Sequence, residues 1–267
     1  MNQPIILVKF LISRLIRPFS LTERTIKLWR LSEVPVQEVS NMNFPTQSGC
    51  RKKVVIRSSS DIRVPAYSNE AQATIVRMSN KHTYTRGHGF SITDIAPCAD
   101  MEYFLSADPL RINLWNLHVH DESFNVVDLM PPRMEDISHL ITGLVCANRS
   151  PSLFAYSTNR GSIRLCDTRS SALCDRPILT FDSLAADEPS LLTLLINSIS
   201  SISFGNTSDR FVFARDYLNV KVWDIQMPSC PMEVYPIQAH LRSHLSVIYD
   251  AELIFDDFKL AISPDDR

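Results

Sequence analysis

Four side chains that can share hydrogen bonds occur in order along the first half of the chain: His88, Ser106, Asp108 and Trp115. The histidine follows a glycine, the serine precedes a polar turn, and the aspartate begins that turn. Side chains of these types can hydrogen-bond in series toward the indole N–H, a donor that needs a partner when it is buried. We therefore predict structural roles for His88, Ser106 and Trp115, with Asp108 able to complete the series.

Enzymatic chemistry finds little support in the sequence. It contains no Gly-x-Ser-x-Gly elbow, no glycine-rich phosphate loop and no His-Glu-x-x-His. The run "GHGFS" at 87–91 resembles a nucleophile loop only superficially. His118 and His120 share one face of a strand, as a metal-binding pair can, but no third ligand is evident. We expect a protein without catalytic residues, metal or cofactor.

The run that ends on Trp115 recurs along the chain, as "ERTIKLWRL" (23–31), "DPLRINLWNL" (108–117), "NRGSIRLCDT" (159–168) and "DYLNVKVWDI" (216–225). Each run has a polar turn followed by alternating residues that lead to Trp29, Trp115, Cys166 or Trp223. A period of two is typical of a strand with one buried face. We predict equivalent strands near 24–31, 108–117, 160–168 and 216–225, with the four Trp or Cys side chains in structural roles.

The spacing of these strands is typical of WD-type repeats. Trp29 and Trp115 are 86 residues apart, or twice 43, and such repeats run roughly 40–45 residues, each forming a four-stranded propeller blade. The longer later intervals need insertions, for which 131–140 and 182–196 are candidates. We predict an all-β, incomplete WD-repeat propeller that forms a single domain over residues 1–267. About four to five blades of an expected seven would be present.

Composition is that of a soluble globular protein: 267 residues, 45% hydrophobic, 21% charged, with a net charge of −2. This charge predicts neither a nucleic-acid nor a membrane partner. Six well-separated cysteines predict reduced thiols in an intracellular protein. The apolar stretch at 4–19 is short and is interrupted by Lys9, Arg14 and Arg17. It favours a buried strand, with a signal or anchor as the alternative.

Taken together, these runs resemble the B-type, 55 kDa class of WD-repeat regulatory subunits of serine/threonine protein phosphatase 2A. The matching segments are 24–33, 103–117, 121–142, 155–176, 215–225 and 240–258. The most specific is "IRLCD" followed by "SALCD". The family's first blade, the segment before its second blade, and its last two blades find no counterpart. The resemblance therefore predicts a truncated and diverged member.

The resemblance implies a non-catalytic subunit that binds the phosphatase scaffold (A) and catalytic (C) subunits and recruits phosphoprotein substrates to them. It also implies a cytoplasmic location, with a nuclear one open as well. A second hypothesis is a generic WD-repeat interaction scaffold that no longer binds the phosphatase.

The resemblance also implies a set of substrate-binding residues on one propeller face: Tyr84, Thr85, Asp108, Pro109, Met134, Ile137 and Leu140. Thr85 and Pro109 stand where the family has histidine and aspartate, so we expect weaker attraction for basic substrate segments. Tyr84 is open to a second interpretation, as a structural residue that opens a blade. Met134, Ile137 and Leu140 are spaced along one side of a helical turn, which is also typical of a stripe packed on a core.

Overall fold

The computed structural model describes residues 19–22, 24–36, 39–40, 58–59, 62, 64, 66–67, 73–182, 191–255 and 258–266. Regular structure there is mainly β, which confirms the predicted fold class. The chain divides into two compact units. Unit 1 comprises residues 1–9, 19–27 and 82–267, and unit 2 comprises residues 10–18 and 28–81. That residues 1–267 form one propeller stays a prediction.

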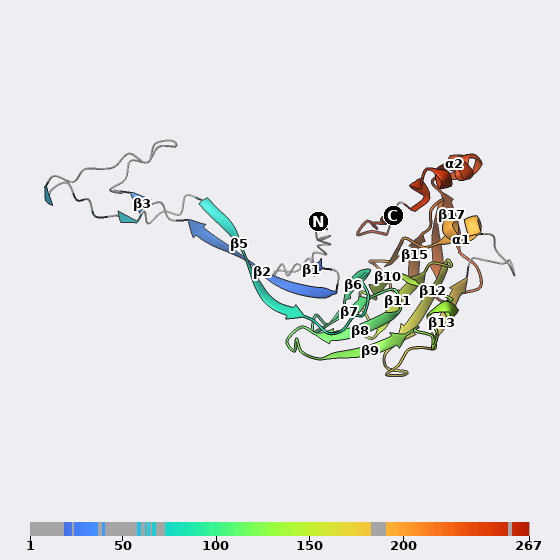
Figure 1. Cartoon of the computed structure of the whole chain (residues 1–267), viewed down its shortest axis with the longest axis horizontal. Coiled ribbons are helices and arrows are strands. Elements are labelled where there is room, and N and C mark those ends of the chain that lie inside the picture. The colour runs from blue at the N-terminus through green and yellow to red at the C-terminus, as the bar shows by residue number, and fades with distance from the viewer. Residues whose placement is uncertain are drawn as a thin grey trace. The chain divides into compact units, whose positions relative to one another are not determined.

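Three four-stranded antiparallel sheets follow one another along unit 1 (Figure 1). The first contains β6 (Asp94–Pro97), β7 (Tyr103–Ala107), β8 (Arg111–Asn116) and β9 (Ser123–Asp128). The second contains β10 (Ile141–Cys146), β11 (Leu153–Thr158), β12 (Ser162–Asp167) and β13 (Leu179–Asp182). The third contains β14 (Ser201–Phe204), β15 (Phe211–Arg215), β16 (Asn219–Asp224) and β17 (Glu233–Pro236). Each strand pairs with the next along the chain, as in a propeller blade.

The strands that the repeat analysis predicted at Trp115, Cys166 and Trp223 are the third strands of these sheets, β8, β12 and β16. Each ends in the same way. The side chains of Asn116, Asp167 and Asp224 each accept a hydrogen bond from the backbone N–H two residues further on. The three segments are therefore structural equivalents.

The predicted insertions connect one sheet to the next. Residues 129–140, between β9 and β10, contain the short 3-10 helix η2 (Met134–Asp136). The connection from β13 to β14 contains α1 (Leu191–Asn197). Met134, Ile137 and Leu140 do not share one helical turn, because Ile137 is already extended and Leu140 is bonded to the turn at Asn159. The helical interpretation of this spacing is wrong.

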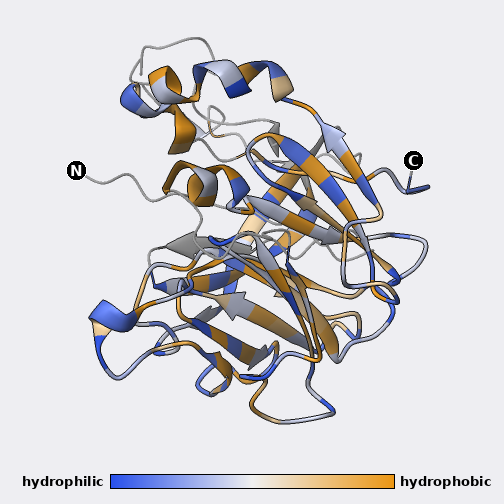
Figure 2. Ribbon diagram, turned by 90° about the vertical axis from the view of Figure 1, so that its right-hand side faces the viewer, coloured by the Kyte–Doolittle hydropathy of each residue, from blue (hydrophilic) through white to orange (hydrophobic). Residues whose placement is uncertain are grey.

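Two hydrophobic clusters hold the three sheets together. One joins residues of the β6–β9 and β10–β13 sheets, including Leu105, Val127, Leu144 and Tyr156. The other joins the β10–β13 and β14–β17 sheets, and Trp223 lies in it. Hydrophobic and polar residues alternate along the strands, so that each sheet can pack against a neighbour while the turns stay polar (Figure 2).

The remaining strands are β1 (Phe19–Thr22), β2 (Thr25–Val36), β3 (Val39–Ser40), β4 (Ala66–Tyr67) and β5 (Ala73–Tyr84). β1, β2 and β5 form a three-stranded sheet, and β3 pairs with β4. Trp29 lies on β2 within unit 2 and is partly exposed. The apolar stretch at 4–19 falls outside the described residues except for Phe19.

The chain after β17 forms three short helices: η3 (Ala239–His244), α2 (Leu245–Asp250) and η4 (Leu253–Phe255). Apolar residues of η3, α2 and α1 pack against Tyr217, Leu218 and Ile254. Within the part of the chain that the structure describes, none of the helices has the length and apolar character needed to cross a membrane.

Candidate functional site

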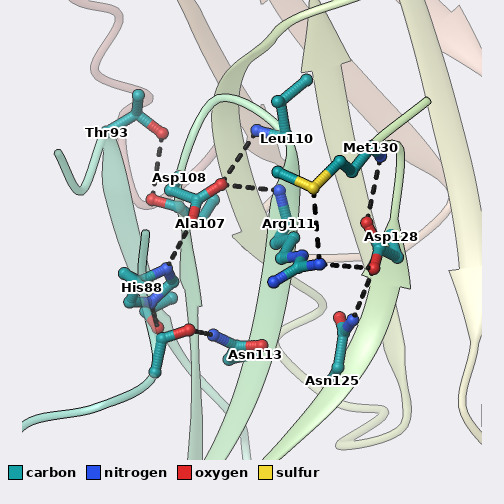
Figure 3. Close-up of polar contacts among 12 residues, drawn as sticks. His88, Thr93, Ala107, Asp108, Leu110, Arg111, Asn113, Asn125, Asp128 and Met130 are labelled. Atoms are coloured by element: carbon teal, nitrogen blue, oxygen red, sulfur yellow. Dashed lines mark hydrogen bonds and ion pairs between the residues drawn. The ribbon is translucent and has the colours of Figure 1, made fainter. Parts of the chain in front are cut away.

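The predicted hydrogen-bond series is present in the β6–β9 sheet, and Figure 3 shows its contact between His88 and Asp108. The indole Nε1–H of Trp115 donates to Ser106 Oγ at 2.7 Å. Ser106 Oγ lies 2.6 Å from His88 Nε2, and His88 Nδ1 lies 3.0 Å from Asp108 Oδ2. With the His88 proton on Nδ1, every donor in the chain points toward the Asp108 carboxylate.

Local sequence positions each member of this series. Ser106 lies on β7 and Trp115 on β8, and Phe104 pairs with Trp115 across the two strands. A side chain at Gly87 would overlap the Trp115 ring, so the Gly87–His88 pair lets the loop lie directly on the indole.

Asp108 also holds the turn between β7 and β8. Its Oδ1 accepts hydrogen bonds from the backbone N–H groups of Leu110 at 2.9 Å and Arg111 at 2.7 Å (Figure 3). Burial alone would raise the pKa of Asp108, but the hydrogen bonds from His88 and from these two backbone groups outweigh it and lower the pKa. The carboxylate is therefore stabilised in its charged form.

This array of serine, histidine and aspartate is not placed for catalysis. Ser106 and Asp108 are fully buried and His88 is 9% exposed. The serine oxygen already accepts the indole N–H, and no surface reaches it for a substrate to approach. The array has a structural role. It provides hydrogen-bond partners for the buried indole N–H and for the buried Asp108 carboxylate, and through Asp108 it also holds the β7–β8 turn.

The lowered pKa of Asp108 predicts a specific loss of stability in acid. Its contribution is complete above its unfolded pKa of about 3.9 and is lost as pH falls through the lower folded value. We expect the free energy of unfolding of the wild type to fall more steeply below pH 5 than that of Asp108→Asn. Urea titrations from pH 7 to pH 2.5 measure this. Asp121→Asn, on an exposed turn, is the control, and an equal acid slope in wild type and Asp108→Asn would contradict the prediction.

The structure places two of the expected substrate-binding residues in the interior. Tyr84 is 1% exposed; its hydroxyl donates to the Leu117 carbonyl at 3.0 Å, and its ring packs edge-on against Phe104 and Trp115. The buried Asp108 carboxylate is occupied by its hydrogen bonds to His88 and to the backbone of the turn. These two side chains are arranged to hold the sheet together rather than to face a binding partner.

In the two other sheets, Cys166 and Trp223 occupy the position of Trp115 at the end of the third strand. In the second, Cys166 replaces tryptophan, and the loop after β12 folds back so that Cys174 is buried beside it; the Cys174 N–H donates to the Val126 carbonyl at 2.7 Å. Burial raises the pKa of Cys166 to about 12, so the thiol stays protonated. In the third sheet Trp223 is buried against Phe181.

A cavity of about 400 Å³ lies where the three sheets present equivalent turns and connections. Each of the three turns between second and third strands contributes one residue to its lining: Pro109, Asn159 and Tyr217. Connections that enter the sheets also contribute, among them Thr93, Leu140 and Ser200. Of the expected site residues, the cavity therefore brings together Pro109 and Leu140.

The other expected residues lie apart from the cavity lining. Met134 is 52% exposed on η2, Ile137 is half-buried, and Thr85 is exposed just after β5. Met134 and Ile137 belong to the connection that ends at Leu140. They therefore lie on the chain that leads to Leu140, which lines the cavity.

The sequence did not predict that the C-terminal segment, through Phe258 and Lys259, lines one side of the cavity. Phe258 contacts the Tyr217 ring at 5.6 Å between centroids, lies under the Arg215 guanidinium, and accepts a hydrogen bond from Ser200 Oγ through its carbonyl. Lys259 follows it at the cavity and is exposed. Alignment of the repeats would have found Tyr217, which has the turn position of Pro109, and Asn159, which has the turn position of Asp108.

The lining of this cavity carries little charge. Among the described residues that line it, Lys259 carries the formal charge and no carboxylate is present. The same described part of the chain contains no cluster of three or more His, Cys, Asp or Glu residues suited to a metal ion. The cavity has a mixed lining of apolar and hydroxyl side chains.

These features define a WD-repeat protein: consecutive four-stranded antiparallel sheets, a tryptophan at the end of a third strand, and a buried His–Ser–Asp series that closes on it. No family model matches the chain. Curated proteins do match, and those described here are all named as regulatory subunits of protein phosphatase 2A. The chain is 37% identical over 245 residues to the gamma isoform of the 55 kDa regulatory B subunit of serine/threonine-protein phosphatase 2A from Mus musculus, covering 91% of this chain and 53% of the mouse protein.

Proteins from two other organisms have the same kind of name and a similar degree of identity. Identity is 35% over 249 residues to the regulatory B subunit of protein phosphatase PP2A from Schizosaccharomyces pombe, covering 93% of this chain and 53% of the yeast protein. It is 38% over 252 residues to the serine/threonine-protein phosphatase 2A regulatory subunit sur-6 of Caenorhabditis elegans, covering 93% and 49%. Over the matched region the chain is similar to the 55 kDa regulatory B subunits of protein phosphatase 2A, which confirms the resemblance found in its sequence. It spans about half the length of the curated relatives it matches.

Proposed function

We propose that the chain is a non-catalytic regulatory subunit of protein phosphatase 2A that recruits phosphoprotein substrates and positions them for the catalytic subunit. The observation that carries the proposal is the similarity over more than nine tenths of the chain to proteins named as regulatory, and not catalytic, subunits. The buried Ser–His–Asp array, whose side chains are occupied by structural hydrogen bonds, agrees with a role without chemistry. Such a subunit acts by proximity and orientation of the substrate.

Co-purification tests the assembly step. The tagged full chain, expressed in cells that contain the phosphatase, is expected to retain both the scaffold (A) and catalytic (C) subunits. Circular dichroism and size-exclusion chromatography of the same preparation show whether it is folded. A folded chain that retains neither subunit would overturn the proposal.

The second candidate is a WD-repeat scaffold without phosphatase contacts. It is favoured by Thr85 and Pro109, which stand where the resembled family has histidine and aspartate, and by the lack of a carboxylate among the described residues of the cavity lining. Recovery of other proteins by a folded chain, without either phosphatase subunit, would support it.

Substitution of the apolar connection next to the cavity predicts a loss of substrate recruitment without loss of assembly. We expect Met134→Ser combined with Leu140→Ser to lower kcat/KM of the assembled phosphatase for a phosphoprotein substrate about tenfold, the effect of removing one or two contacts of the kind that dominate interfaces. Leu173→Ser removes an exposed leucine from the loop after β12 and is expected to change kcat/KM less than about twofold.

Two readouts separate recruitment from assembly and chemistry. The amounts of scaffold and catalytic subunit retained, and the turnover of p-nitrophenyl phosphate, are expected to stay at wild-type levels in both variants. If the double variant loses activity on the small substrate as well, the apolar connection does not act through substrate recruitment.

A further inference from the structure

Beside the cavity, on the connection and the turn that border Leu140 and Asn159, lies a group of basic side chains with no role in the contacts described so far. We propose that His139, Arg160 and Arg164 form a binding site for a phosphate monoester, of the kind carried by a phosphorylated serine or threonine side chain. The proposal concerns binding by this chain alone and does not depend on assembly with the phosphatase.

Backbone geometry brings the first two residues together. The Leu140 N–H donates to Asn159 Oδ1 at 2.9 Å, and the Asn159 N–H donates to the Leu140 carbonyl at 3.0 Å. This reciprocal pair continues the β10–β11 ladder, in which Ile141 is opposite Thr158. His139 and Arg160 are the next residues beyond this pair, close enough for the Arg160 charge to act on the His139 imidazole, and their neighbours Leu140 and Asn159 line the cavity.

Arg164 completes the group from β12. It lies opposite Tyr156 on β11, and its Nη1 donates to the Tyr156 hydroxyl at 3.4 Å. Tyr156 is fully buried, so this contact anchors one side of the guanidinium group at the sheet while the rest of the side chain stays half-exposed.

Arg160 and Arg164 differ from three other arginines of the chain in having no carboxylate partner among the described residues. Arg111, Arg169 and Arg210 each have a carboxylate within 3.1 Å. Within the described part of the chain, neither Arg160 nor Arg164 has a carboxylate at ion-pair distance. Their guanidinium donors are therefore open to an anion, and the planar fork of arginine matches the oxygens of a phosphate.

His139 responds to these charges. Burial, together with the guanidinium groups of Arg164 and Arg160, lowers its pKa, and Asp182 at the end of β13 acts weakly in the opposite direction. Its Nδ1 is buried and has no hydrogen-bond partner among the described residues. A dianion bound by the two arginines would offset their charge, so it would favour the imidazolium and add a third donor.

Two neighbouring guanidinium groups suit a phosphate monoester better than a single carboxylate. Asp182 is the acidic group that faces His139, and Glu135 and Asp136 are exposed on the same connection as His139. These carboxylates repel any anion, so a ligand must gain more from the two arginines than it loses to them. A phosphate monoester carries about −1.5 to −2 at pH 7 and three acceptor oxygens, enough to contact both guanidinium groups together, whereas a carboxylate offers one charge and two oxygens.

The test uses the full chain and a fluorescein-labelled phosphoserine peptide, measured by fluorescence anisotropy at low ionic strength. We expect a Kd below about 1 mM, loss of binding for the unphosphorylated peptide, and weakening by added salt. Arg160→Glu, at an exposed turn position, is expected to weaken binding at least tenfold, as for loss of a charge-assisted contact. His139→Gln, which keeps a donor without a titrating charge, is expected to weaken it less.

Arg149→Glu is the matched control, because it makes the same charge change on the exposed turn between β10 and β11. It is expected to stay within about twofold of wild type. Competition by inorganic phosphate would show that the phosphate group suffices, and its failure to compete would assign binding to the peptide-linked monoester. Binding that ignores phosphorylation, or that falls equally in Arg149→Glu and Arg160→Glu, would overturn the site.

An NMR titration of His139 gives an independent readout. In the wild type, saturating phosphopeptide is expected to raise the pKa of the His139 imidazole, since the bound dianion favours its charged form. At the same peptide concentration, Arg160→Glu is expected to show a smaller rise, because less peptide is bound. A wild-type His139 that does not respond while the peptide is bound would place the phosphate elsewhere.

Discussion

Replacing Trp115 with alanine is expected to lower the free energy of unfolding by about 3–5 kcal/mol, the range found when a large buried aromatic is truncated. Trp115 is 1% exposed and packs against Tyr84 and Phe104. Its removal also leaves Ser106 without the indole donor. The loss combines a cavity with a broken polar series, and urea denaturation measures it.

Two further variants separate these contributions. Trp115→Phe keeps an aromatic ring and removes the N–H, so it is expected to cost about 1–2 kcal/mol, mainly for the hydrogen bond and imperfect packing. Phe124→Ala truncates an aromatic that is 61% exposed on β9 and is expected to stay within about 0.5 kcal/mol of wild type. If Trp115→Ala costs no more than Phe124→Ala, the tryptophan does not hold the sheet.

The β-strand pattern could be read from the sequence because alternation and a large terminal side chain act locally. Trp115 and Trp223 mark the third strands of their sheets, and Cys166 marks the equivalent strand where the tryptophan is absent. The hydrogen-bond series could also be inferred, because the chemistry of His88 and Ser106 has few other uses beside a buried indole. These inferences needed residue types and spacing alone.

The surface was harder to predict because exposure depends on partners distant in sequence. Tyrosine is a residue type common at binding surfaces, but Tyr84 is packed against Phe104 and Trp115 in the interior. Met134 and Leu140 have helical spacing, yet the bonds between Leu140 and Asn159 extend the connection instead. The wall formed by Phe258 depends on a fold-back of the C-terminal segment that no local pattern encodes.

The three sheets also show that one position can be stabilised by different chemistry. Asp108 and Asp216 begin equivalent turns, and each accepts the N–H groups two and three residues further on. Asp108 meets His88, whereas Asp216 meets Lys221, whose Nζ lies 2.8 Å from its Oδ2. The same buried acid is thus compensated by a loop histidine in one sheet and by a strand lysine in another.

Breaking the Asp216–Lys221 pair is expected to have the second large effect on stability. The two side chains are 1% and 11% exposed, and removal of one partner of a buried pair leaves an uncompensated charge at a cost of about 3–5 kcal/mol. We expect this loss of unfolding free energy for Asp216→Ala, which also removes the acceptor for the Leu218 and Asn219 N–H groups. Urea denaturation at neutral pH measures it.

A double-mutant cycle tests whether charge compensation is the reason. Asp216→Asn keeps an oxygen for the turn but removes the charge, and Lys221→Met keeps the volume of the lysine stem. Each single variant is expected to be destabilised by about 2–3 kcal/mol, and the double variant to lie within about 1 kcal/mol of wild type, because no buried charge remains uncompensated. Additive losses would mean that the two side chains act independently. In that case Asp216 would contribute through its turn hydrogen bonds alone, and the parallel with His88 and Asp108 would fail.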